Sequence, residues 1–248
     1  MKIFISAFLC GFLSLVTFGQ SFKEDQKDYP RVRKAYVDKG SSVRELCETH
    51  NLEIASLSIY LRAFKEEETL ELWGKDDDSK KFVLLEEYPF CSSSGSIGPK
   101  RKQGDYQIPE GFYHIDRFNP SSSFYLSLGI NYPNRSDRIL GDPSNPGGDI
   151  FIHGSCVTIG CIPITDPLIK ELYVFAIEAS NNGQRRIPVT IFPARLTADK
   201  YTELKRTHAS KEDWILLWTA LRTAYDFFDK NQQLPGITVR SDGQYQIN

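Results

Sequence analysis

The residues best suited to chemistry lie in one short segment, where a histidine ends an apolar stretch and a cysteine follows eight positions later. His153 comes directly after Phe151 and Ile152, and Cys161 follows Gly160. A free cysteine is mostly protonated at neutral pH, and a neighbouring imidazole can take its proton and stabilise the resulting ion pair. The pair therefore predicts covalent catalysis, with Cys161 as nucleophile and His153 as its base.

Two glycines adjoin this pair. Without a Cβ atom, Gly160 can adopt backbone angles closed to other residues, so the N–H groups around Gly160 and Cys161 are expected to converge on a developing oxyanion. The imidazole of His153 also needs one fixed tautomer. Since no carboxylate is obvious nearby, we expect its second nitrogen to bond a backbone carbonyl, that of Gly154.

Other interpretations of the segment stay open on these residues alone. Zinc ligation by His153, Cys156 and Cys161 fits no common finger spacing and lacks a clear fourth ligand. A local disulfide between Cys156 and Cys161, or simple burial of Cys161, also fits the sequence. One histidine and one cysteine in a short loop are a weak signal by themselves.

The composition is that of an ordinary globular protein. The 248 residues, 40% hydrophobic and 25% charged, suffice for one sizeable core and an accessory element. A formal net charge of -2 argues against a nucleic-acid binder, which needs a strong basic surplus. The one compact basic run, Lys100-Arg101-Lys102, is interpreted as a solvated loop face.

The N-terminus, residues 1–19, has the pattern of a secretory signal peptide. Lys2 gives the positive start, and residues 3–18 are almost wholly apolar. This stretch, which contains Cys10, is shorter than the ~20 residues that a membrane-spanning helix needs. We therefore expect an exported, periplasmic mature protein without a stable membrane span.

The elements that must position the site are indicated by hydrophobic periodicity. Residues 20–56 form a polar lead-in with a capping box that predicts a short helix at about 42–50. Two long loops, 91–111 and 131–148, separate later strands, and the second leads into the strand that ends at His153. The predicted strands are 57–63, 70–72, 82–85, 112–115, 124–128, 150–152 and 187–192.

Helices dominate the remainder. Asp166 and Pro167 open a helix over 166–179, and Thr197 opens a short one. Residues 210–213 cap a further helix, whose aromatic face is interpreted as core. The predicted fold class is α+β with a helical C-terminal extension over 194–248.

The sequence resembles a known family, the L,D-transpeptidase catalytic-domain (YkuD-type) proteins of the bacterial envelope. Their pattern is a His-Gly at a strand end and a Gly-Cys preceded by Ser or Thr, matched here by His153-Gly154 and by residues 158–161. Further landmarks match in order at residues 70–73, 88–89, 104–105, 109–113 and 132–134. The resemblance covers about 57–193, and the branch it is most similar to includes hydrolases that release lipoprotein from peptidoglycan.

The resemblance implies a β-sandwich-like catalytic domain over 57–193. It also implies a cysteine that attacks the amide after the third residue of a peptidoglycan stem peptide. Carried over by position, Cys161 is the nucleophile, His153 is base and then acid, and the Gly160 and Cys161 amides form the oxyanion hole. Transfer of the acyl group to an amine gives a crosslink, and transfer to water gives trimming. No metal and no organic cofactor is implied.

Two positions beside the cysteine depart from the crosslinking members. Ile159 stands where they usually have a histidine, and Pro163 where they have an arginine. The expected function is an exported L,D-transpeptidase. The alternatives are a hydrolase, either an L,D-carboxypeptidase or an amidase releasing lipoprotein or crosslinked peptide, and an inactive cell-wall-binding relative. Expected partners are peptidoglycan stem peptides and, for the amidase, an envelope lipoprotein.

Two more pairs complete the predicted site. Tyr132 and Asn134, in the loop before the catalytic strand, are expected to contact substrate, with turn formation as the alternative. Cys91 ends a strand and Cys156 lies in the catalytic loop. We expect their Cα atoms to lie within about 7 Å, close enough for a disulfide that leaves Cys161 free.

Overall fold

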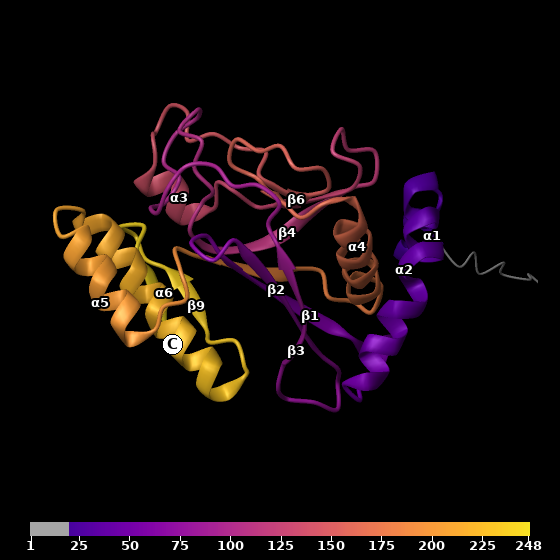
Figure 1. Cartoon of the computed structure of the whole chain (residues 1–248). Helices are drawn as coiled ribbons and strands as arrows, with labels where there is room; N and C mark the ends of the chain where they lie inside the picture. Colours follow the sequence, from indigo (N-terminus) through magenta and orange to yellow (C-terminus); the bar gives the residue numbers. More distant parts are fainter. Residues whose placement is uncertain (1–19) are drawn as a thin grey trace, which may run out of the picture.

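The structure is a computed structural model that describes residues 20–248 (Figure 1). The predicted signal peptide, residues 1–19, lies outside the described residues. Within 20–248, no helix combines the length and the apolar character needed to cross a membrane. A mixed sheet lies at the centre of this part of the chain, with helices on both sides of it (Figure 1).

The sheet has eight strands in the order β3-β2-β1-β8-β4-β5-β6-β7. Neighbours run antiparallel except for β1 with β8 and β6 with β7, which are parallel. This curled sheet with its helices confirms the predicted α+β class. The strands are β1 (Ser58–Phe64), β2 (Thr69–Lys75), β3 (Val83–Pro89), β4 (Gly111–Asn119), β5 (Ser127–Ile130), β6 (Phe151–His153), β7 (Ile162–Pro163) and β8 (Ile187–Phe192).

Two groups of helices enclose the sheet (Figure 1). On one side lie α1 (Phe22–Lys27), α2 (Pro30–Thr49) and α4 (Asp166–Asn181), and on the other α5 (Ala198–Thr207) and α6 (Glu212–Asn231). Two short helices, η1 (Ile54–Ser56) and α3 (Arg135–Leu140), lie in the connections.

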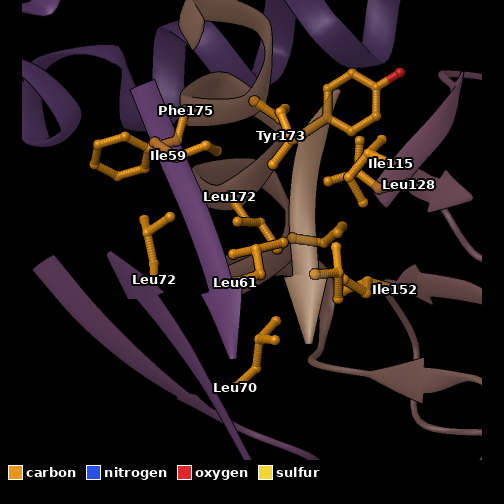
Figure 2. Packing of buried hydrophobic residues seen from close by; sticks show 14 of the residues in the cluster. Ile59, Leu61, Leu70, Leu72, Ile115, Leu128, Ile152, Leu172, Tyr173 and Phe175 are labelled. Atoms are coloured by element: carbon orange, nitrogen blue, oxygen red, sulfur yellow. The ribbon is translucent and has the colours of Figure 1, made fainter. Parts of the chain in front are cut away.

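The alternation of side chains along β1 explains why helices cover both faces. Ile59 and Leu61 pack with Leu172 of α4 in the main core (Figure 2). Phe64 points the other way and packs with Trp218 of α6. Because successive side chains of a strand point to opposite faces, this apolar run needs a helix on each side. The aromatic face of α6 is therefore core, as predicted.

The N-terminal helix is longer than predicted. The prediction of a short helix at about 42–50 is wrong, since α2 begins at Pro30. Val32, Ala35 and Val43 are buried along one face of α2, and proline is favoured at a first helical position. These apolar residues are widely spaced among charged ones, so the sequence does not show a clear apolar face of a helix there.

One predicted strand boundary and the predicted all-helical C-terminal extension are also corrected. The strand expected at 124–128 begins only at Ser127, and Phe124 precedes it in a loop. The C-terminal extension is not wholly helical, because β9 (Ile237–Val239) and β10 (Tyr245–Ile247) form an antiparallel hairpin. Each of these strands has three residues, too few to show a clear period.

Candidate active site

His153 and Cys161 are brought together by the parallel pairing of β6 with β7. The register aligns His153 with Pro163. When this register is extended by two residues toward the N-terminal end of both segments, Phe151 lies opposite Cys161. Since side chains two apart in a strand share a face, His153 and Cys161 lie on the same face as diagonal neighbours.

The imidazole of His153 is buried, with 1% of its surface exposed. Its Nδ1 atom lies 2.5 Å from the carbonyl oxygen of Gly154, the acceptor expected from the sequence. A carbonyl oxygen only accepts, so Nδ1 carries the proton and Nε2 carries the free lone pair. Within residues 20–248, Nε2 has no hydrogen-bond partner. It is therefore free to take a proton.

Burial favours the uncharged form of both His153 and Cys161. Burial lowers the pKa of His153, although the hydrogen bond to Gly154 acts in the opposite direction. Burial raises the pKa of the Cys161 thiol, a backbone hydrogen bond from Phe151 opposes this, and the nearby Asp149 adds to it. These shifts favour a thiol at Cys161 and a neutral imidazole at His153. The Cys161 Sγ atom donates to the Asp149 carbonyl oxygen at 3.6 Å.

A phenyl ring that the sequence analysis missed covers His153. The ring centroids of Phe124 and His153 lie 4.6 Å apart, with the planes inclined by 31°. Phe124 thereby keeps water from one face of the imidazole and contributes to its burial. No motif marked this residue, because the contact depends on the loop before β5.

Gly154 is required by close packing. A Cβ atom there would lie 2.5 Å from Asp166 Oδ1 and 2.8 Å from the carbonyl oxygen of Phe124. The same Asp166 oxygen accepts a hydrogen bond from the amide of Ser155 at 2.8 Å. A side chain at position 154 would therefore displace the start of α4 or the residue that covers His153.

Cys161 opens into a cavity of about 230 Å³ between the two long loops. A larger cavity of about 550 Å³, near Asp76 and Gln184, has no cysteine or histidine in its lining. Of these two cavities, the smaller one is therefore the one lined by a cysteine thiol. Its lining residues are Lys100, Gln103, Gly104, Tyr106, Gly148, Asp149, Ile150, Ile159 and Cys161.

The expected oxyanion hole is occupied by a side chain in this structure. The amides of Gly160 and Cys161 both donate to Thr158 Oγ1, at 3.2 and 2.9 Å. The Thr158 hydroxyl in turn donates to the carbonyl oxygen of Cys161 at 2.8 Å. Gly160 has a φ of 132°, and a Cβ there would lie 3.0 Å from the Gln107 carbonyl oxygen. Thr158 and Gly160 thus shape the turn that carries Cys161. The two amides form hydrogen bonds that stabilise this turn.

The two predicted substrate contacts lie outside the Cys161 cavity. Tyr132 is buried, and its hydroxyl donates to the Pro146 carbonyl at 2.8 Å. Asn134 caps α3 by accepting from the Asp137 amide at 3.1 Å, and it donates to the Phe112 carbonyl at 2.9 Å. Both line a separate hollow. The structure gives these residues loop-stabilising contacts and does not bring them to Cys161.

Two further cysteines, Cys91 and Cys156, adjoin the site. Cys91 and Cys156 form a disulfide with a Cα–Cα distance of 5.4 Å, and Cys47 and Cys161 are free. The disulfide fastens the loop between His153 and Cys161 to the segment after β3. It also excludes a Cys156–Cys161 bond and removes Cys156 as a zinc ligand in this structure.

Lys100 is the second residue of this site that the sequence analysis missed. The prediction of a solvated loop face is wrong for Lys100, which is 4% exposed. Its Nζ donates to Asp105 Oδ1 at 2.6 Å and to the Lys102 carbonyl at 2.9 Å. An aspartate five positions after the lysine was the available signal, but charge runs are usually exposed.

The fold and the site together define an α+β domain with a cysteine–histidine pair at one edge of a curled sheet. The chain belongs to the L,D-transpeptidase catalytic-domain family, YkuD, whose model matches residues 60–191. It is 33% identical over 214 residues to the Escherichia coli K12 protein named "Putative L,D-transpeptidase YafK", covering 86% of this chain and 82% of that protein.

Solved structures with a similar fold include two proteins of other bacteria. One is the helical cell shape determining protein Pgp2 of Campylobacter jejuni, with 17% identity, a TM-score of 0.45 and 79% of each chain covered. The other is Bd1075 of Bdellovibrio bacteriovorus, with 18% identity, a TM-score of 0.41 and coverage of 76% of this chain and 79% of that one.

Proposed function

We propose that this protein is an exported L,D-transpeptidase that forms an acyl-enzyme on Cys161 with a peptidoglycan stem peptide and passes it to an amine. One observation carries the proposal. Cys161 opens into a cavity while His153, on the same face of the adjoining strand, presents an unpartnered Nε2 atom. Membership of the family supports the stem-peptide amide as the bond that is attacked.

The proposed reaction moves two protons in turn through His153. The thiol proton leaves with the departing amine, and a proton of the acceptor amine restores the thiol. His153 Nε2 takes the thiol proton as Cys161 Sγ attacks the carbonyl carbon of the donor amide. The imidazolium then gives that proton to the amine nitrogen as the C–N bond breaks, leaving a thioester. The acceptor amine loses a proton to His153 as it attacks the thioester. The imidazolium gives this second proton to sulfur when the C–S bond breaks.

The Gly154 carbonyl supports both steps. It holds the Nδ1–H tautomer, so Nε2 is the nitrogen that can accept a proton. It also lies against the positive charge that develops when Nε2 is protonated, which a carbonyl dipole stabilises. A carboxylate would raise the pKa of His153 further, whereas the carbonyl leaves the resting imidazole neutral.

Hydrolysis of the acyl-enzyme is the second candidate function. Ile159 lines the cavity with 72% of its surface exposed, and Pro163 lies beside His153 in β7. Neither side chain offers a polar group that orients an incoming amine. Transfer to an amine needs a site that presents the acceptor in line, whereas water needs none. An L,D-carboxypeptidase or a lipoprotein-releasing amidase would use the same acyl-enzyme.

Export is supported by two independent features. Residues 1–19 have the charge and apolar pattern of a signal peptide. The Cys91–Cys156 disulfide belongs to an oxidising compartment, because thiols stay reduced in the cytosol. A periplasmic enzyme with access to peptidoglycan fits both.

Mass spectrometry of defined peptidoglycan fragments tests the proposal. The protein without residues 1–19 is incubated with disaccharide tetrapeptide, with crosslinked dimers and with lipoprotein-linked muropeptides. We expect new dimers from the tetrapeptide and an acyl adduct on Cys161. Released peptide or lipoprotein without new dimers would favour the hydrolase. Unchanged substrates with no adduct would overturn both, and Cys161→Ser is the matched inactive control.

A further inference from the structure

Lys100 is the only cationic side chain among the residues that line the Cys161 cavity. Its side chain reaches the cavity through a space that a glycine leaves open. A Cβ atom at Gly147, where φ is 87°, would lie 3.1 Å from Lys100 Cε and 2.9 Å from Gln103 Oε1. The chain on the opposite side of the cavity is thus shaped to admit this lysine.

The ammonium group of Lys100 is held firmly but is not saturated. Its bonds to Asp105 and to the Lys102 carbonyl use two of the three N–H donors of an ammonium. Within the described part of the chain, the third N–H has no hydrogen-bond acceptor, and the Tyr132 ring centroid lies 6.0 Å from Nζ. A buried donor without a partner is costly, and a ligand in the cavity would remove that cost.

The charge of Lys100 is only partly offset by Asp105. The Asp105 carboxylate also accepts hydrogen bonds from the amides of Arg101, Lys102 and Gln107, at 2.8, 3.0 and 3.1 Å. Its negative charge is therefore shared among four donors. The other charged residue of the lining, Asp149, forms an ion pair with Arg117 at 3.1 Å.

Lys100 and Cys161 line the same cavity. Among the groups that act on the Cys161 thiol, Lys100 is one that favours the thiolate. An anion bound to the lysine would then lie in the same small cavity as the sulfur. A peptide substrate that presents an amide carbonyl to Cys161 brings one kind of anion with it, a carboxylate.

We propose that Lys100 is a specificity residue that binds a carboxylate of the donor peptide and so positions the neighbouring amide on Cys161. This inference rests on the proposed function, since it names the part of the substrate that the same cavity recognises. The lysine supplies one charged hydrogen bond, with Asp105 holding it in place. Peptides whose carboxylate is amidated lose that bond and bind more weakly.

The first experiment needs no peptidoglycan. Iodoacetate and iodoacetamide alkylate a thiolate in the same way, the sulfur forming a C–S bond as iodide leaves, and differ only in carboxylate against amide. Rates at Cys161 are followed by peptide-level mass spectrometry at physiological salt, with glutathione as the reference thiol. We expect the wild-type ratio of iodoacetate to iodoacetamide rates to exceed that of glutathione. In Lys100→Met it should fall by about tenfold.

Three variants separate this role from a merely structural one. Lys102→Met removes an exposed lysine from the same loop and should leave the ratio unchanged. Lys100→Arg keeps a cation and should retain most of the preference. The double variant Lys100→Met with Asp105→Asn removes the buried pair together, which avoids an uncompensated carboxylate if the single variant is unstable. Equal ratios in wild type and the double variant, or an equal fall in Lys102→Met, would overturn the proposal.

The second experiment uses the peptide substrate. Tetrapeptides with a free or an amidated carboxylate beside the scissile amide are compared, and kcat and KM are measured separately. We expect amidation to raise KM about tenfold for wild type and to have no effect on Lys100→Met. If Lys100→Met instead lowers kcat equally for the free and the amidated peptide, Lys100 acts on the reacting carbonyl and not on the carboxylate. If no peptide turns over, the alkylation ratio still reports on Lys100, so failure of the two proposals is distinguishable.

Discussion

The indole of Trp218 donates to Glu110 Oε2 at 2.7 Å. This bond joins helix α6 to the long loop 91–111, part of which lines the Cys161 cavity. Glu110 is buried and also receives the Lys65 ammonium at 2.9 Å and the Gly98 amide at 2.7 Å. A Cβ atom at Gly98 would lie 2.5 Å from the Trp214 ring. The C-terminal helix thus fixes the segment that leads to Lys100.

Replacing Trp218 by Phe should destabilise the protein by about 1–3 kcal/mol. The change removes the indole donor and leaves one buried oxygen of Glu110 without its partner, the situation that costs most. Urea unfolding followed by circular dichroism measures the loss. Trp214→Phe is the matched control, because the Trp214 ring packs against Gly98, His208 and Trp218 without a hydrogen bond to Glu110. Equal losses in the two variants would mean that volume and not the hydrogen bond decides the effect.

Cys161→Ser and His153→Ala should each abolish turnover of peptidoglycan fragments, and the double variant should be little worse than either. The two side chains act on one proton, so removing either one removes the unit. Turnover is measured by chromatography of the fragments, and melting temperatures show that the variants are folded. Activity of Cys161→Ser near the wild-type level would refute the assignment of the nucleophile.

The local part of the site was predictable from the sequence. A glycine before Cys161 and a strand that ends at His153 are close in the chain, so their relation depends on one strand pair. Thr158 was visible as a motif residue, but its bond to the two amides depends on the geometry of the turn. A sequence pattern does not reveal which way an amide points.

Other parts depend on contacts between distant segments. Lys100 is buried because Asp105 binds it and the loop with Gly147 leaves room for it, and neither condition shows in a run of basic residues. The capping role of Asn134 was visible in the sequence. Asp137 stands three positions after Asn134, which is the spacing of the capping box that the structure contains.

The Cys91–Cys156 disulfide should contribute about 4 kcal/mol to stability, because it closes a long loop in the unfolded chain. The double replacement Cys91→Ala and Cys156→Ala should lose this amount in urea unfolding. It should also lower turnover, since the disulfide anchors the loop between His153 and Cys161. Cys47→Ala, at the other free cysteine, should leave turnover unchanged. Thiol counting under denaturing conditions that finds four free thiols in residues 20–248 would contradict the disulfide itself.

Asp137 should make the protein less stable as the pH rises from about 4 to 7. Burial raises the pKa of Asp137 to about 7 from its usual 3.8. The folded state therefore holds the proton more tightly than the unfolded state. The stability that this provides is complete below the unfolded pKa and is lost as the pH rises through the folded one.

Asp137→Asn is neutral at every pH and keeps an oxygen that can accept from the Asn134 amide. Its free energy of unfolding, measured in urea between pH 4 and 8, should fall less with rising pH than that of the wild type. Asp78→Asn, at an exposed aspartate between β2 and β3, is the control and should keep the wild-type slope. Parallel curves for wild type and Asp137→Asn would show that the carboxyl is ionised throughout.

The last prediction concerns the protonation state of the catalytic pair. Burial raises the pKa of Cys161 and lowers that of His153, so alkylation by iodoacetamide should increase with pH and reach its midpoint above the ~8.5 of a free cysteine. Turnover should behave differently, because the attack uses His153 as base and needs only that the imidazole is neutral. Activity, as kcat/KM, should therefore persist as the pH falls and be lost only below ~6.5, where a histidine of lowered pKa takes up its proton. Both profiles are recorded between pH 5 and 10, with Cys161→Ser as the background for alkylation. A plateau of fast alkylation near pH 6 would instead demonstrate a preformed thiolate–imidazolium pair.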